Sequence, residues 1–180
     1  MPLPVDRRFL SGAQLTRRRA SKAVVIIAAA GAIVVIAAIL GHGMLWNVSA
    51  SVPRGLYAVM LDEPCRRGSL VSFRPPPGAA MIIYSRDYLP AGAGLIKQLV
   101  GLPGDLVCVR PAGLYVNAVR FGDVAVTDSR GRLLVPYRFC GAVAAGQAFV
   151  ATTAHLSYDS RYFGPVPLSS LTLVVSVWTY

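Results

Sequence analysis

The chain has 180 residues, of which 54% are hydrophobic and 14% are charged, and its mean hydropathy is +0.54. An average globular protein has about 25% charged residues, so this composition excludes an intrinsically disordered chain. The length suits one domain of ordinary size with one additional apolar segment, and it argues against a two-domain soluble enzyme.

The formal net charge of +10 is unevenly distributed. Residues 1–22 hold six of the 18 basic side chains and one acidic side chain, whereas residues 47–180 hold 12 basic and seven acidic side chains. The longest basic run in this second part is Arg66-Arg67. A surface that follows nucleic-acid phosphates is not indicated, and we expect no nucleic-acid partner.

A continuous apolar segment follows the basic residues. Ala23–Leu40 contains 18 residues without a charged side chain, and the apolar character extends through Trp46. At about 1.5 Å per residue, the 18 residues reach roughly 27 Å, and the extension completes the ~30 Å hydrocarbon layer. We therefore predict a basic cytoplasmic segment at residues 1–22, a transmembrane helix at residues 23–46 and an exported domain at residues 47–180.

The basic residues fix the expected orientation of this helix. Arg17–Arg19 and Lys22 precede the apolar segment, and no comparable cluster follows it before Arg66, so the positive-inside rule keeps the N-terminus in the cytoplasm. A cleaved signal peptide is the alternative, although its apolar region is usually about 7–15 residues long. The expected location is a bacterial inner membrane, crossed once, with the folded domain in the periplasm.

Cys65, Cys108 and Cys140 all lie in the exported part, where disulfides persist. Three pairings are open, and we expect Cys108–Cys140 because both residues flank one strand-rich part of the chain. The bridge is worth on the order of 3–4 kcal/mol in the chain-entropy model. The cysteines and the two histidines form no recognisable zinc pattern, so we expect no metal and no cofactor.

The exported part reads as mainly β. Short runs rich in Val, Leu, Ile, Tyr and Phe alternate with turn-forming residues, and no long helical period follows the apolar segment. Pro103 and Gly104 suit the central positions of a type II turn. The expected strands are Leu56–Leu61, Ser69–Phe73, Met81–Tyr84, Leu95–Val100, Leu106–Arg110, Leu114–Val116, Pro136–Cys140, Phe149–Thr152 and Leu171–Trp178.

Lys97 is the one lysine beyond the apolar segment, in a chain with 16 arginines. Lysine can lose its proton when its pKa is lowered, whereas arginine cannot. Ile96 and Leu99 in a buried strand would desolvate the ammonium group and favour the neutral amine, which can take a proton from a serine hydroxyl. Lys97 is therefore a candidate general base, although a single lysine is more often a solvated surface residue.

Three separated motifs give this lysine a context. Ser49–Tyr57 follows the apolar segment, Lys97 precedes the stretch Val100–Asp105, and Ser157–Val166 lies near the C-terminus. In this order the motifs resemble the serine-lysine signal peptidase family, over nearly the whole exported part. The resemblance implies a signal-peptidase-like antiparallel β-sheet catalytic domain after one N-terminal transmembrane helix.

The resemblance also implies roles for individual residues. Ser51, shortly after a membrane helix and just before a proline, matches the nucleophile, and Lys97 matches the general base. Ser49 matches a donor to the oxyanion. The implied reaction is acyl transfer, in which neutral Lys97 takes the proton of Ser51 and Ser51 attacks a peptide carbonyl. An oxyanion donor is worth about 2.7–4 kcal/mol in such a reaction.

The third motif supplies supporting residues in this family. Ser157 matches the serine that hydrogen-bonds the base, and Asp159 and Arg161 match the pair that supports the site, with Asp159 the nearer of the two to catalysis. A Ser-His-Asp triad of Ser51, His155 and Asp159 is a weaker alternative, because His155 and Asp159 are only four residues apart in a loop-like stretch.

The spacing within the first motif resembles one branch of the family. Ser51 and Pro53 are separated by one residue, not two, and Gly55-Leu56-Tyr57 follows. This pattern is similar to the TraF branch, the conjugative-transfer peptidases that mature the pilin subunit. It implies a propilin or similar exported substrate, the inner membrane and other proteins of the conjugation apparatus as partners. The residues do not distinguish hydrolysis from head-to-tail cyclisation.

Two other functions remain open for the sequence. The first is a general type I signal peptidase that processes many preproteins. The second is a non-catalytic, membrane-anchored assembly protein of a transfer apparatus, which would tolerate Ser51→Ala and Lys97→Met.

Overall fold

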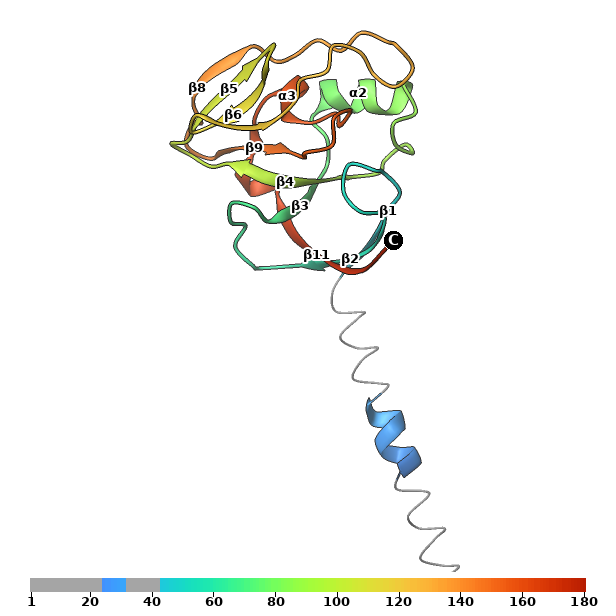
Figure 1. The fold of residues 1–180 in the computed structure, drawn as a ribbon. Coiled ribbons are helices and arrows are strands. Elements are labelled where there is room, and N and C mark those ends of the chain that lie inside the picture. Colours follow the sequence, from blue (N-terminus) through green and yellow to red (C-terminus); the bar gives the residue numbers. More distant parts are fainter. Residues whose placement is uncertain (1–23, 32–42) are drawn as a thin grey trace, which may run out of the picture. The chain divides into compact units, whose positions relative to one another are not determined.

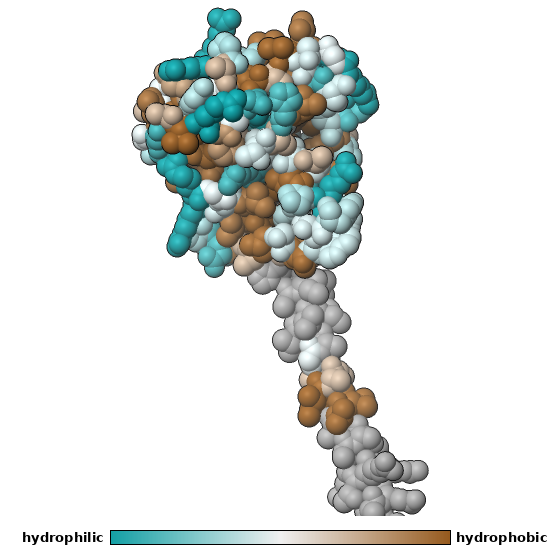
Figure 2. All heavy atoms as spheres, viewed as in Figure 1, coloured by the Kyte–Doolittle hydropathy of each residue, from teal (hydrophilic) through white to brown (hydrophobic). Residues whose placement is uncertain are grey.

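The computed structural model describes residues 24–31 and 43–180, and the chain divides into two units, Met1–Gly41 and His42–Tyr180. In the first unit residues 24–31 form an apolar helix (Figures 1 and 2). Among the described residues, no helix is both long enough and apolar enough to cross a membrane. The basic segment and residues 23 and 32–42 of the expected span lie outside the described residues, so the transmembrane helix stays a prediction.

The expected helix extends too far at its C-terminal end. Met44–Asn47 form strand β1, which pairs antiparallel with β2 (Gly55–Met60) and places Leu45 opposite Tyr57. The prediction was wrong for residues 44–46 because a short apolar run has the same composition in a buried helix and in a strand. Pairing with β2 decides the outcome here.

The second unit consists of two antiparallel sheets and short helices (Figure 1). The strand order is β1-β2-β11-β3-β4-β9-β10 in the larger sheet and β7-β6-β5-β8 in the smaller one. A mainly β fold with antiparallel sheets is thereby confirmed. The remaining elements are β3 (Leu70–Phe73), α2 (Pro77–Ser85), β4 (Leu95–Gly101), β5 (Leu106–Arg110), β6 (Gly113–Val116), β7 (Val119–Gly122), β8 (Phe139–Ala142), β9 (Gln147–Ala151), α3 (Ser160–Phe163), β10 (Val166–Pro167), η2 (Leu168–Ser170) and β11 (Thr172–Thr179).

Two of the expected strands need correction. Met81–Tyr84 lies inside helix α2, which begins with Pro77 in its first turn and buries Ala79 and Ile83. Proline is favoured in the first turn of a helix, so the proline-rich stretch begins helix α2 and does not form only a turn. Strand β8 starts at Phe139 and not at Pro136, because proline has no N–H to donate to a sheet.

Strand β4 lies between two parts of the hydrophobic core and is buried along almost its whole length. Leu99 packs in a cluster with Ile83 of α2, whereas Val100 packs in a cluster with Val107 of β5. Side chains two residues apart share one face of a strand, so Lys97 lies on the same face as Leu99. The core therefore places a lysine in a strand that is shielded from water.

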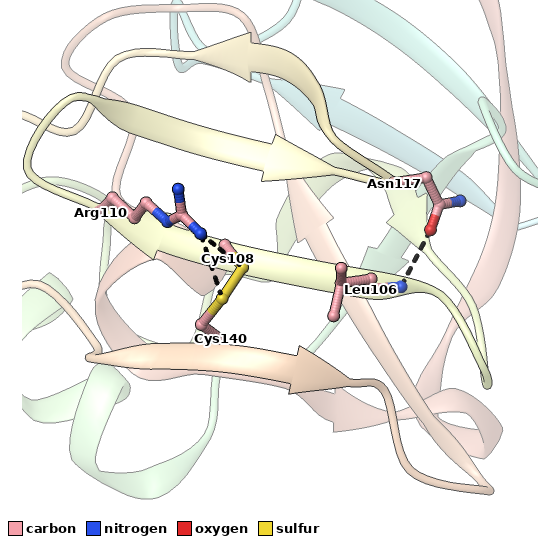
Figure 3. The surroundings of a disulfide bond; sticks show 5 residues. All are labelled: Leu106, Cys108, Arg110, Asn117 and Cys140. Atoms are coloured by element: carbon pink, nitrogen blue, oxygen red, sulfur yellow. Dashed lines mark hydrogen bonds between the residues drawn. A yellow bond between two sulfur atoms is a disulfide. The ribbon is translucent and has the colours of Figure 1, made fainter.

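The smaller sheet carries a disulfide between Cys108 of β5 and Cys140 of β8 (Figure 3). The two residues are directly opposite each other in the antiparallel register, and this is the pair that the sequence favoured. The guanidinium of Arg110 lies 3.8 Å from one sulfur and 3.7 Å from the other. Cys65 is a free, half-buried thiol.

Candidate active site

Ser51 lies in the loop between β1 and β2, and Val52 beside it is buried in the core. The loop ends at Gly55, which has φ +142°. A Cβ atom at this position would collide with the carbonyl oxygen of Trp178 in β11, so the close approach of the two strands requires glycine. Glycine in the first motif therefore has a structural reason, because it lets β2 leave the loop directly against β11.

Lys97 is a buried cation with one side-chain hydrogen-bond partner in the described part of the chain. The side chain is 2% exposed, and its Nζ donates to the hydroxyl oxygen of Ser157 at 2.7 Å. Burial lowers the pKa of Lys97 from 10.5 to about 8; Asp159 opposes this change, and Arg161 adds to it. Part of the Lys97 amine can therefore be neutral in the pH range in which proteins usually function.

A buried ion pair holds the segment that carries Ser157. Asp159 precedes α3 and caps it by accepting the backbone N–H of Arg161 at 3.2 Å. The carboxylate also accepts from Arg161 Nε at 2.8 Å and from its terminal nitrogen at 2.7 Å, and both side chains are fully buried. Arg161 donates further to the carbonyl oxygens of Thr152, Ala154 and Ser157 at 3.1, 3.2 and 3.4 Å. The pair thus fixes the backbone around Ser157.

One cavity of about 370 Å³ collects the residues that the three motifs supply. Ser49 and Ser51 from the first motif, Lys97 of β4 and Ser157 from the third motif all line it. The hydroxyl of Ser49 donates to Asn47 Oδ1 at 3.1 Å in this state. Four residues that are up to 108 positions apart in the sequence are therefore brought together at one opening.

Asp159 and Arg161 are not among the residues that line the cavity. The second oxygen of the Asp159 carboxylate accepts from Arg161 and from the backbone N–H of Thr152 at 3.3 Å. Both carboxylate oxygens are therefore engaged. Asp159 is thus fully buried and fully paired within the protein, and its part in catalysis stays a prediction.

Another part of the cavity lining is polar, and the sequence motifs did not predict it. Asp128 is buried and accepts from the hydroxyl of Tyr88 at 2.6 Å and from Arg132 Nε at 2.7 Å. Arg86 donates to the carbonyl oxygen of Leu133 at 2.9 Å. These contacts join the end of α2 to a loop about 40 residues further along the chain. No local sequence pattern predicts a contact over this separation.

The alternative triad does not form. His155 Nδ1 lies 3.2 Å from Asp123 Oδ2 at the surface, with the imidazole 63% exposed, whereas Asp159 is occupied by Arg161. Within residues 24–31 and 43–180, no group of three or more His, Cys, Asp or Glu side chains is arranged to hold a metal ion. The cavity lining offers serine hydroxyls, the amine of Lys97, and the carboxylate and guanidinium groups of its polar wall.

Comparison with known proteins shows the family of this chain. A family model described as signal peptidase, peptidase S26, matches residues 17–179. The chain therefore belongs to the S26 signal peptidase family, and the resemblance seen in its motifs is confirmed.

The similar proteins carry names from conjugation. The conjugal transfer protein TraF of Agrobacterium fabrum strain C58 is 38% identical over 134 residues, covering 69% of this chain and 76% of the relative. TraF of Agrobacterium tumefaciens strain 15955 is 37% identical over 155 residues, with coverages of 80% and 86%. A plasmid transfer protein TraF of Escherichia coli is 31% identical over 141 residues, with coverages of 72% and 78%. A crystal structure of a signal peptidase I from Enterococcus faecalis V583 matches 65% of this chain and all of that chain at 25% identity, with a TM-score of 0.39.

Proposed function

We propose that this protein is a serine endopeptidase in which Ser51 is the nucleophile and Lys97 is the general base. The observation that carries the proposal is the buried amine of Lys97, which lines the same cavity as Ser51 and has a pKa lowered to about 8. A neutral amine in a water-poor site is the form of lysine that can activate a hydroxyl.

The hydrogen bond from Lys97 to Ser157 orients this base. Because Nζ donates to the Ser157 hydroxyl oxygen at 2.7 Å, the lone pair of the neutral amine stays available for the proton of Ser51. After proton transfer Ser51 attacks the peptide carbonyl; the C–N bond then breaks as protonated Lys97 gives its proton to the leaving amine, which leaves the acyl-enzyme. The backbone N–H of Ser51 and the hydroxyl of Ser49 stabilise the oxyanion, for which the Ser49 hydroxyl turns away from Asn47. Asp159 and Arg161 hold the segment of Ser157 and transfer no proton.

The proposed substrate is a propilin or a similar exported protein of a conjugative transfer system. The conjugal and plasmid transfer names of the relatives support this context. The acyl-enzyme ends either on water or on the amino terminus of the substrate. A cyclic product is lighter by one water molecule than the linear product, so intact mass spectrometry distinguishes the two reactions.

The proposal is tested by the processing of a co-expressed propilin in strains that carry single variants. Ser51→Ala should abolish processing, and Ser51→Cys should retain a trace. Lys97→Arg should also be inactive although it keeps the positive charge, because guanidinium stays protonated. Ser170→Ala, at an exposed serine of η2 outside the cavity lining, is the matched control and should process normally.

Each contrary outcome points to a different account. Full processing by Lys97→Arg, with folding verified by circular dichroism, would remove the serine-lysine mechanism. Propilin processing that is unchanged in every variant strain does not depend on Ser51 or Lys97, and it would favour the non-catalytic assembly protein. Cleavage of ordinary secretory preproteins in preference to the propilin would favour a general type I signal peptidase.

We further propose that the protein is anchored in the bacterial inner membrane with residues 47–180 in the periplasm. Two features support this: the apolar side chains Val24–Ile27 are 65–71% exposed, and the second unit has an exposed aromatic group. In that group the Trp46 and Trp178 rings stack at 5.9 Å, and Tyr180 lies 5.2 Å from Trp178. Tryptophan and tyrosine are enriched where a protein meets the membrane surface.

Alkaline phosphatase fusions test this topology. A fusion after Tyr180 should be active, because the enzyme folds only after export, and a fusion after Lys22 should be inactive. An inactive fusion after Tyr180, or a mature N-terminus found between Asn47 and Ser51, would contradict the anchored arrangement.

A further inference from the structure

We propose that Asn47 is the positioning residue of the nucleophile loop, residues 48–54. Its side-chain amide holds this loop in the conformation that presents Ser51 and Ser49 to the cavity. The inference rests on the proposed function, in which Ser51 attacks the substrate.

The side chain of Asn47 sits inside the loop that it holds. It is the last residue of β1 and is 6% exposed. Its Nδ2 donates to the carbonyl oxygens of Ser49, Val52 and Pro53 at 2.9, 3.1 and 3.0 Å. Its Oδ1 accepts from the backbone N–H and from the hydroxyl of Ser49, both at 3.1 Å. One buried amide therefore binds the backbone on both sides of Ser51.

These contacts require a planar group that donates from one end and accepts at the other. Two N–H hydrogens serve three carbonyl oxygens, so at least one hydrogen is shared. Aspartate has the same shape but offers no N–H and would face the three carbonyls with oxygen. Leucine has the same branching and number of side-chain heavy atoms, although it is bulkier, and it forms none of the bonds. In either variant buried backbone groups lose their partner, so the loop has to rearrange to satisfy them.

Two other contacts anchor the loop to the sheet. The hydroxyl of Tyr57 donates to the Pro53 carbonyl oxygen at 2.6 Å, and Val52 packs in a buried cluster with Tyr57 and Ile96. Ile96 precedes Lys97 in β4, so the cluster ties the loop to the strand of the proposed base. The cluster sets where the loop lies on the sheet, and the amide sets its internal conformation.

The amide also sets the starting direction of the Ser49 hydroxyl. In the free protein this hydroxyl donates to the same Oδ1 that accepts the Ser49 backbone N–H. When the hydroxyl turns toward a substrate oxyanion, the backbone bond to Asn47 remains. The loop can therefore keep its conformation while one donor moves.

Asn47→Asp and Asn47→Leu test the proposal in the purified full-length protein. The probe is a fluorogenic peptide copied from a propilin site that the wild-type protein cleaves. We expect kcat to fall on the order of 100-fold, as for other displacements of about 1 Å at a reacting group. KM and the pH at which activity rises should stay unchanged, because the burial of Lys97 is not altered.

Asn117→Asp is the matched control. Asn117 accepts from the backbone N–H of Leu106 and donates to Asp105, both at 2.9 Å, in a turn outside the cavity lining. The same change of amide to carboxylate there should leave kcat unchanged. Urea unfolding of all variants shows whether a loss of folded protein explains any loss of rate.

A second readout does not depend on catalysis. The Ser49 amide hydrogen is bonded to Asn47 Oδ1, so in Asn47→Leu its exchange with solvent should accelerate by roughly tenfold or more, while amides of β2 stay protected. Three outcomes would overturn the proposal and leave the proposed function standing. They are unchanged exchange of the Ser49 amide in Asn47→Leu, a wild-type kcat in the Asn47 variants while Ser51→Ala is inactive, and a loss of rate that unfolding alone explains. Cleavage of the peptide by Ser51→Ala would instead contradict the proposed function, and with it the claim that the loop presents a nucleophile. The exchange rate of the Ser49 amide would still show whether Asn47 orders the loop.

Discussion

The reactivity of single side chains at this site depends on how far each of them is exposed to solvent. Lys97 and Ser157 are 2% and 3% exposed, whereas Ser51, which lines the same cavity, is only half-buried. A base that has lost its solvent shell and a nucleophile that a peptide can reach are the two conditions for attack on a carbonyl. In the proposed mechanism Lys97 meets the first condition and Ser51 meets the second.

The burial of Lys97 has a consequence for stability. The folded protein disfavours the charged amine because its pKa falls from 10.5 to about 8. Below pH 8 both the folded and the unfolded chain carry the proton, so the full cost of about 3 kcal/mol opposes folding. Between pH 8 and 10.5 the folded chain has released the proton and the unfolded chain has kept it. Stability therefore rises with pH in this window.

Lys97→Met should accordingly be inactive but more stable than the wild type at pH 7. We expect a gain of about 2 kcal/mol, since the loss of the bond to Ser157, worth about 1 kcal/mol, offsets part of the relief. The gain should shrink as the pH rises from 8 to 10. Urea unfolding of the detergent-solubilised proteins, followed by tryptophan fluorescence, measures the difference at each pH. A variant less stable than the wild type at pH 7 would show that burial of the amine carries no such cost.

Sequence reasoning reached some of these residues and missed others for physical reasons. Lys97 was visible because its apolar neighbours already predict burial. The resemblance already implied that Asp159 and Arg161 support the site, whereas the backbone groups that Arg161 holds depend on the folded arrangement and had no sequence signal. The sequence marks Asn47 only as the first residue of the exported part. Its role in the loop could not be predicted, because its five hydrogen bonds form only when the loop closes around it.

At the scale of elements, strands with alternating or continuous β-branched residues were predictable, and short apolar runs were not. Leu106–Arg110 has the predicted bounds. Met81–Tyr84 became part of α2 and Met44–Trp46 became part of β1, because a run of three or four apolar residues fits either kind of element and tertiary packing selects one. The turn at Pro103 and Gly104 formed as expected, with Gly104 at φ +88° and the Asp105 N–H donating to the Leu102 carbonyl oxygen at 3.0 Å.

The disulfide belongs to this scale because it links two strands of the smaller sheet. Replacing Cys108 and Cys140 together by serine should lower the free energy of unfolding by about 3–4 kcal/mol. Peptidase activity below the unfolding transition should be retained, since neither residue lines the cavity. Cys65→Ser is the control, and its stability should match the wild type. Equal stability of the double variant and this control would mean that the bridge does not stabilise the fold.

At the scale of the whole molecule, one β-rich unit assembles its site from three segments that are distant in the chain. The loop after β1 supplies Ser51, β4 supplies Lys97, and the segment before α3 supplies Ser157. The family motifs predicted that these segments meet. The structure adds the buried strand that carries Lys97, the buried ion pair of Asp159 and Arg161, and the Asn47 amide inside the loop that carries Ser51. Membership in the S26 family is consistent with this arrangement.

The central claim is that Lys97 acts as a neutral base toward Ser51. The most direct measurement is kcat/KM for the propilin-derived peptide between pH 6 and 10, with the unfolding free energy followed over the same range. The account predicts a rise of about tenfold per pH unit at low pH, levelling near the Lys97 pKa of about 8, and no activity in Lys97→Arg at any pH. A profile that is flat over this range, or the same profile in Lys97→Arg, would contradict it.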